Sequence, residues 1–176
     1  MSPVPHDLAS RIREAALLEG DFVLSSGKRS SFYVDKYLFS TEPNLLRDVA
    51  NALSKKLPQG VERLAGVELG AVPLVVATAL ATGLPYVIVR KSAKEYGTGR
   101  GIEGYLERGE RVALIEDVVT TGAQAVQAAR NLTEAGAEVV TIVAVLDRRE
   151  AAGEHLEEFS FEALLRMDDL RVSNED

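Results

Sequence analysis

The sequence predicts an α/β fold in which a central parallel sheet is flanked by helices on both faces. Continuous apolar runs are typical of strands buried in such a sheet, and four occur, at residues 64–67, 86–89, 111–115 and 139–146. Apolar side chains also recur at helical spacing in three intervening segments, residues 46–57, 74–80 and 122–134. Strands that alternate with helices along a chain favour a parallel sheet.

The chain is expected to form a single domain spanning residues 1–176. With 46% hydrophobic and 27% charged residues its composition is that of an ordinary globular protein. The predicted helices carry local signals: Pro58 and Gly60 stop the first, and Pro73 lies in the first turn of the second.

About the first 40 residues are predicted to form a smaller N-terminal unit, here called the hood. Apolar residues at helical spacing in residues 8–16 indicate an amphipathic helix that ends at Gly20. Residues 22–24 and 31–35 flank a turn at Gly27 and are predicted to be the two strands of a hairpin.

The segment IEDVVTTGAQ, residues 115–124, carries the clearest functional signal. Two adjacent carboxylates, Glu116 and Asp117, directly follow a buried strand. The backbone N–H groups of residues 120–122 would open the next helix, where the helix dipole favours a phosphate and glycine lets it approach closely. The carboxylates are too close to that anion to be its ligands, and they suit the hydroxyl groups of a ribose.

The alternative is a strand that ends in a solvated acidic loop, with threonine acting only as a helix cap. Adjacent acids after a strand are common, and a threonine cap is ordinary. The ordered combination of buried strand, acid pair, TTG sequence and helix favours a binding site for a sugar phosphate.

A long polar and glycine-rich stretch, residues 90–109, is predicted to be a mobile lid. Loops of this length in compact domains are usually functional or mobile. Cations on such a segment could close over a pyrophosphate and exclude water; they are Arg90, Lys91, Lys94 and Arg100. A solvated basic loop is the alternative, but the position one strand before the phosphate motif favours a lid.

The hairpin places two cations beside two aromatic residues. Lys28 and Arg29 are followed by Phe32 and Tyr33. Arginine offers a planar fork for a carboxylate, and aromatic rings can flank a flat heterocycle. A basic hairpin tip with core aromatics explains the rings equally well, but it explains the clustered cations less well.

Two further strand ends could contribute to the same site. Arg148 follows Asp147 at the end of a buried strand, although an ordinary ion pair of Arg148 with Asp147 or Glu150 is equally expected. Gly70 and Ala71 follow another strand, and their backbone N–H groups could form an anion nest.

Charge and composition exclude several classes of function. The net charge of −7 argues against a general nucleic-acid binder. The absence of cysteine excludes disulfides and thiolate sites, and two histidines far from any motif disfavour a histidine metal site. No apolar run is long enough for a signal peptide or a membrane span, so a cytoplasmic protein is expected.

These segments, in this order, resemble the orotate phosphoribosyltransferase family of type I phosphoribosyltransferases. The resemblance extends from about residue 22 to residue 150, and the SGKRS hairpin, the RK-x-x-K-x-YG loop and the DRRE strand end distinguish it from purine enzymes. It implies a Rossmann-like type I phosphoribosyltransferase fold. It also implies transfer of the ribosyl phosphate of 5-phosphoribosyl 1-pyrophosphate (PRPP) to orotate, giving orotidine 5′-monophosphate and pyrophosphate in de novo pyrimidine (UMP) biosynthesis.

The resemblance implies roles for individual residues. Catalysis would involve Lys94, Glu116 and Asp117. PRPP would contact Arg90, Lys91, Lys94, Tyr96, Glu116, Asp117, Val118, Val119, Thr120, Thr121, Gly122, Ala123 and Gln124. Orotate would contact Lys28, Arg29, Phe32, Tyr33, Thr120 and Arg148. Mg²⁺ would be held mainly by substrate oxygens, so no dedicated metal ligand is expected, and members are usually homodimers in which one subunit's loop completes the other's site.

The chain departs from the family pattern at a few positions. Tyr96 stands where many members have histidine, and Gly70 stands where some have lysine, so a pyrophosphate contact there would use the backbone. Ala123 and Gln124 stand where glycine and serine are frequent. Two alternatives stay open: a phosphoribosyltransferase for a purine or uracil, and a PRPP-sensing regulator that binds RNA or DNA, which the acidic charge disfavours.

Overall fold

The computed structural model describes residues 6–23, 27, 29–91, 101–150 and 153–171. Its central layer is a seven-stranded sheet in the order β5-β4-β3-β6-β7-β9-β8. The inner strands run parallel: β4 (Tyr86–Val89), β3 (Arg63–Val67), β6 (Arg111–Val119), β7 (Glu138–Asp147) and β9 (Phe159–Arg166). The predicted parallel sheet is therefore confirmed, and two short antiparallel edge strands, β5 (Ile102–Glu103) and β8 (His155–Leu156), make it a mixed sheet.

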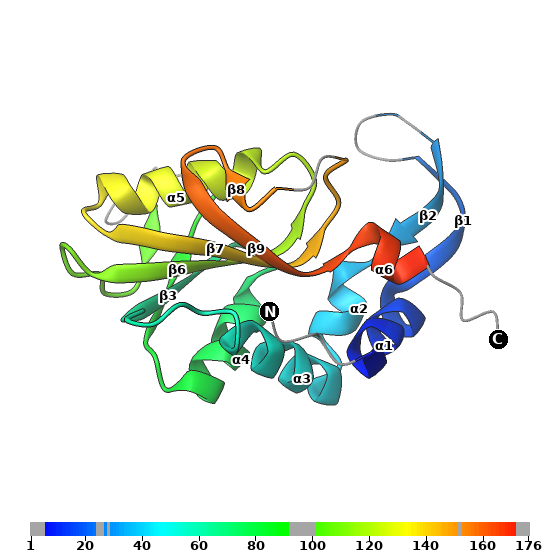
Figure 1. Ribbon diagram of the computed structural model, residues 1–176, viewed down its shortest axis with the longest axis horizontal. Helices are drawn as coiled ribbons and strands as arrows, with labels where there is room; N and C mark the ends of the chain where they lie inside the picture. The colour runs from blue at the N-terminus through cyan, green and yellow to red at the C-terminus, as the bar shows by residue number, and fades with distance from the viewer. Residues whose placement is uncertain (1–5, 24–26, 28, 92–100, 151–152, 172–176) are drawn as a thin grey trace.

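Helices cover both faces of the sheet, as the alternation of elements predicted. Figure 1 shows α3 (Pro43–Ser54) and α4 (Val72–Thr82) on one face and α5 (Ala123–Glu134) on the other. Successive residues of a strand point to opposite faces, so Leu114 and Ile115 of β6 belong to different hydrophobic clusters. The longest described helices have 12 residues, and none of those described is long and apolar enough to cross a bilayer.

The hood lies at the end of the sheet where the parallel strands terminate (Figure 1). It contains α1 (His6–Ala16), the antiparallel pair β1 (Leu17–Val23) and β2 (Arg29–Val34), and α2 (Lys36–Ser40). The short helix α6 (Met167–Arg171) follows β9 and packs against α1. The hood therefore lies over the edge of the sheet where the parallel strands end. The predicted ligand-binding residues lie at this edge.

The prediction that the first helix reaches Gly20 is wrong, because α1 ends at Ala16 and the strand begins at once. Leu17 pairs with Val34, and Glu19 pairs with Phe32. Glycine and aspartate, as at Gly20 and Asp21, are poor helix formers, and Leu17 to Glu19 pair with β2. Cross-strand hydrogen bonding thus overrides the apolar spacing at the end of the helix.

Strand β6 is longer than the apolar run that predicted it. It continues to Val119, so Glu116 and Asp117 lie on the strand itself and not on the loop after it. The helix that follows begins at Ala123, with Gly122 as its N-cap. Elements without a sequence prediction are α2, β5, β8, β9 and α6.

Candidate active site

The loop between β6 and α5 forms a small hollow at the carboxyl edge of the sheet. Gly122 has a φ of 88°, in the left-handed region, and its carbonyl accepts the hydrogen bond that starts the helix from Val126 N. The first turn of a helix leaves N–H groups without partners in the helix, and the helix dipole favours an anion there. The hollow, of about 50 Å³, is lined by Glu116, Val118, Val119, Thr120, Thr121, Gly122, Gln124 and Ala125.

A glycine is required at position 122 for packing as well as for backbone conformation. A Cβ atom added there would lie 2.5 Å from Cδ2 of Leu156, which comes from edge strand β8. The edge strand therefore supports the phosphate loop from behind. Nearby, the Thr121 hydroxyl accepts a hydrogen bond from the Ala123 N–H at 3.3 Å.

The two carboxylates of the motif are buried, Glu116 at 6% and Asp117 at 3% exposure. The Asp117 N–H donates to Glu116 Oε1 at 3.0 Å, and the Val118 N–H donates to Asp117 Oδ1 at 2.5 Å. Burial and then the neighbouring Asp117 charge raise the pKa of Glu116 to about 8. At neutral pH the pair therefore holds a largely neutral Glu116 beside the carboxyl group of Asp117.

The two side chains face different surroundings, as expected for neighbours on a strand. Glu116 lines the hollow at the phosphate loop. Asp117 faces the hood, where Lys36 Nζ lies 2.7 Å from its Oδ2 atom. No pattern in the sequence indicated Lys36, because its partner lies on a strand far away in the chain.

Gly70, in the loop between β3 and α4, packs directly against the Asp117 carboxylate. A Cβ atom at Gly70 would overlap Asp117 and would lie 3.1 Å from Lys36 Cε. Of the two amides predicted to form an anion nest, that of Ala71 already donates to Val67 O at 3.2 Å. That part of the prediction is wrong, and the loop contributes a bare glycine backbone beside the acid pair.

Glu68, an acidic residue after β3, contacts the backbone of Lys91 and the side chain of Arg90 at the root of the predicted lid. Glu68 Oε1 accepts a hydrogen bond from Lys91 N at 2.8 Å. Arg90 Nη1 lies 3.9 Å from Glu68 Oε2 and 3.7 Å from Glu103 Oε1, and the buried Nε atom of Arg90 has no hydrogen-bond partner within the described chain. These long contacts leave the Arg90 guanidinium group with capacity for a further anion.

The predicted lid is partly ordered by the sheet. Arg90 N donates to Gly101 O at 2.8 Å, and Ile102–Glu103 pairs with β4 as β5. The expectation of no regular structure over residues 90–109 is therefore wrong at this strand. Lys94 and Tyr96 lie outside the described residues.

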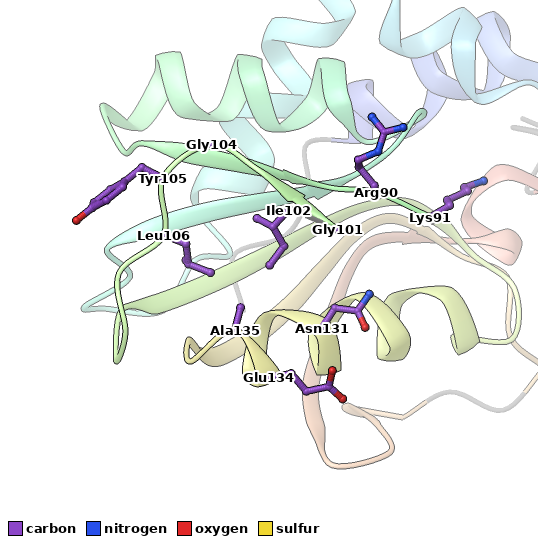
Figure 2. Close-up of a pocket in the computed structure, with 10 residues that line it drawn as sticks. All are labelled: Arg90, Lys91, Gly101, Ile102, Gly104, Tyr105, Leu106, Asn131, Glu134 and Ala135. Atoms are coloured by element: carbon purple, nitrogen blue, oxygen red, sulfur yellow. The ribbon is translucent and has the colours of Figure 1, made fainter. Parts of the chain in front are cut away.

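Two cavities border Arg90 and Lys91 at the root of the predicted lid. One of about 90 Å³ is bordered by Arg90 and Lys91 together with Gln124 at the start of α5. A larger one, of about 710 Å³, lies between residues 101–106 and the C-terminal half of α5 (Figure 2). Figure 2 also shows that the Arg90 side chain points away from α5. Arg90 and Lys91 thus border a cavity of their own that reaches Gln124 at the start of α5.

The hairpin residues predicted to bind orotate differ in their exposure and in their contacts. The guanidinium group of the exposed Arg29 is hydrogen-bonded to both carboxylate oxygens of Asp21, which raises the pKa of Arg29. Phe32 is half-buried and Tyr33 is exposed, because neighbouring strand residues point to opposite sides. The Tyr33 ring packs on Phe22 with centroids 5.5 Å apart. Lys28 lies outside the described residues.

The two arginines after β7 have separate roles in the structure. Arg149, not Arg148, pairs with Asp147, at 2.9 Å, and it also donates to the carbonyls of Gly153 and His155. The Arg148 N–H donates to Val119 O at 2.8 Å. Among the described residues, the Arg148 side chain forms no ion pair, so it remains available at the edge that carries the phosphate loop.

Of the remaining motif residues, the two valines pack against the hydrophobic core and the others are exposed. Val119 is buried in the core, and Val118 is half-buried and packs against the other cluster. Thr120, Thr121, Ala123 and Gln124 are exposed around the hollow. Within the described part of the chain, no group of three or more histidine, aspartate or glutamate side chains could hold a metal ion.

Replacing Gly122 by alanine is expected to disrupt the phosphate loop. The left-handed φ strains any side chain, and the new methyl group would clash with Leu156. We expect PRPP binding, measured by isothermal titration calorimetry, to weaken about 10-fold or more, as for the loss of well-placed anion contacts. Gly83→Ala is the matched control, since Gly83 has a φ of 75° but open space around it. Equal PRPP affinity in the two variants would contradict this account of the loop.

Known proteins with similar sequences point to the same phosphoribosyltransferase family that the sequence motifs resemble. The phosphoribosyl transferase domain family matches residues 40–164. The orotate phosphoribosyltransferase of Natronomonas pharaonis is 50% identical over 157 residues, covering 89% of this chain and 90% of the relative. That of Haloquadratum walsbyi is 46% identical over 177 residues, covering 99% of this chain and 96% of the relative.

Solved structures agree in fold. The crystal structure of Mycobacterium tuberculosis orotate phosphoribosyltransferase in complex with Fe(III) dicitrate matches with a TM-score of 0.84 at 31% identity. The crystal structure of the same enzyme in complex with PRPP matches with a TM-score of 0.80 at 28% identity. Both matches cover 97% of this chain and 100% of the other. Adenine phosphoribosyltransferase from Leishmania tarentolae, at 21% identity and a TM-score of 0.66, shares the fold alone and covers 93% of this chain and 89% of that one. The chain has the type I phosphoribosyltransferase fold and belongs to the orotate phosphoribosyltransferases, a family of pentosyltransferases.

Proposed function

We propose that the chain transfers the ribosyl phosphate of PRPP to orotate, forming orotidine 5′-monophosphate and pyrophosphate in UMP biosynthesis. The observation that carries this proposal is the arrangement at the sheet edge. The loop after β6 and the buried Glu116 line one hollow there, Arg90 and Lys91 border a second one, and Gln124 lines both. Relatives 46% and 50% identical over most of the chain are named for this activity.

In this proposal the 5′-phosphate binds the N–H groups of residues 120–122, and the ribose hydroxyls bind the acid pair. A largely neutral Glu116 can donate a hydrogen bond, whereas an ionised Asp117 can only accept. The C1–pyrophosphate bond would break early, giving the ribose oxocarbenium character as in glycoside hydrolysis. The negative charge of Asp117 would then stabilise the developing positive charge.

Pyrophosphate would be held by Arg90 and Lys91, and by Lys94 and Tyr96 if the lid acts as predicted. The weakly paired guanidinium group of Arg90 supports this placement. Mg²⁺ would neutralise charge on the pyrophosphate when bound, and it would be carried mainly by substrate oxygens. The lack of a carboxylate cluster among the described residues fits such a metal.

For the orotate carboxylate, the structure favours Arg148 over Arg29. Arg148 lies at the end of β7 beside the phosphate loop and has no ion-pair partner in the described region, whereas Arg29 is engaged by Asp21. The neighbouring Arg149 fixes the turn after β7 through Asp147. Thr120, Phe32 and Tyr33 are proposed as the surroundings of the base, and Lys28 remains a prediction outside the described residues.

Several expectations from the family resemblance remain proposals. A homodimer, in which one subunit's lid completes the other's site, would supply Lys94 to its partner. A single domain over the whole chain and a cytoplasmic location also stay predictions. Nucleic acid and membrane partners are not proposed.

The activity is tested directly by a spectrophotometric assay with PRPP and Mg²⁺ against orotate, uracil, adenine and xanthine. We expect turnover of orotate alone, and its loss when EDTA removes the metal. Turnover of adenine or xanthine without orotate would contradict the proposed substrate. No turnover of any base would instead favour a PRPP-binding regulator.

Replacing Arg148 by methionine is expected to impair orotate selectively. Loss of a charge-assisted pair to a carboxylate costs about 2–3 kcal/mol, so kcat/KM for orotate should fall about 30- to 150-fold. Calorimetric PRPP binding without orotate should change little. Arg47→Met on the exposed face of α3 is the control for loss of one positive charge. Equal kinetics in these two variants would show that Arg148 does not bind orotate.

A further inference from the structure

The hood places one lysine in contact with the acid pair. Asp35 caps α2 by accepting a hydrogen bond from Tyr37 N at 3.0 Å, and its own N–H donates to Ala16 O at 2.9 Å. Lys36 is the first residue of this helix. Two independent hydrogen bonds thus fix the backbone from which Lys36 reaches Asp117.

The Lys36–Asp117 ion pair is more deeply buried at Asp117 than at Lys36. The Asp117 side chain is 5% exposed and that of Lys36 is 35% exposed. Gly70 packs against the carboxylate, and the Tyr37 ring centroid lies 5.8 Å from Lys36 Nζ. Burial acts to lower the pKa of Lys36, but the hydrogen bond and charge of Asp117 outweigh it, and the pKa of Lys36 lies above its ordinary value.

Two adjacent buried carboxyl groups do not both ionise easily, because each charge raises the cost of the other. Lys36 contacts Asp117, and Glu116 lies toward the phosphate hollow. The charged or titratable groups that act on this pair include Lys36, and Tyr37 acts on Lys36. Because Lys36 Nζ contacts Asp117 Oδ2, it stabilises a negative charge on Asp117 directly.

We propose that Lys36 is a positioning residue of the transfer site, which holds the Asp117 carboxylate in place as the acceptor for the ribose hydroxyls of PRPP. This inference rests on the proposed ribose-binding role of the acid pair. The Asp117 carboxylate keeps hydrogen-bonding capacity for the ligand: Oδ1 accepts from Val118 N and Oδ2 binds Lys36. A carboxylate has about four acceptor positions, so each oxygen can accept another hydrogen bond.

The test compares Lys36→Met with Lys36→Arg in steady-state kinetics between pH 6 and 9, with PRPP varied at saturating orotate. Without the cation, ionisation of the acid pair needs a higher pH. The acid limb of kcat/KM for PRPP should therefore move to higher pH. Relative to the wild type, kcat/KM for PRPP should fall most at pH 6 and recover toward pH 9, with KM for orotate nearly unchanged. Lys36→Arg should restore the acid limb.

Two controls separate this role from others. Lys55→Met removes one exposed positive charge at the end of α3 and should keep wild-type kinetics. Asp117→Asn should lose activity at every pH, and a normal rate in that variant would refute the ribose assignment itself. If Asp117→Asn is inactive but Lys36→Met keeps the wild-type kcat/KM and the wild-type acid limb, the inference is overturned. A uniform loss at all pH values with a lower Tm would overturn it too, because that indicates only a structural role.

Discussion

The site depends on the burial of two adjacent carboxyl groups at the end of β6, where the chain then opens a helix. Burial keeps Glu116 largely neutral at pH 7, and it makes the charge of Asp117 costly unless a cation balances it. Lys36 supplies that cation from the hood. The hood is thereby coupled to the sheet at the point where the ribose is proposed to bind.

The same region also requires the backbone to pass close to neighbouring side chains at two glycines. Gly70 allows the loop after β3 to touch the Asp117 carboxylate, and Gly122 allows β8 to support the phosphate loop through Leu156. Arg149 links the end of β7 to the start of β8 by pairing with Asp147 and by donating to the carbonyls of Gly153 and His155. Edge elements that take no direct part in binding therefore determine the shape of the site.

Features that are local in the sequence could be predicted, and features that depend on distant contacts could not. The sheet, its helices and the phosphate loop follow from apolar periodicity and from one contiguous motif. The Lys36–Asp117 pair joins residues far apart in the chain, so no spacing reveals it. Neither of the adjacent arginines at positions 148 and 149 could be assigned to Asp147 from the sequence, because the choice depends on the path of the turn. The strand β9 alternates only in its first residues and then becomes continuously apolar, which conceals its period.

The central claim is that the segment from Glu116 to Gln124 binds the ribose phosphate. A crystal structure with orotidine 5′-monophosphate tests it most directly. We predict the phosphate at the N–H groups of residues 120–122 and the ribose hydroxyls within hydrogen-bond distance of Glu116 and Asp117. A ribose phosphate bound elsewhere, for example in the larger cavity beside residues 101–106, would contradict the account.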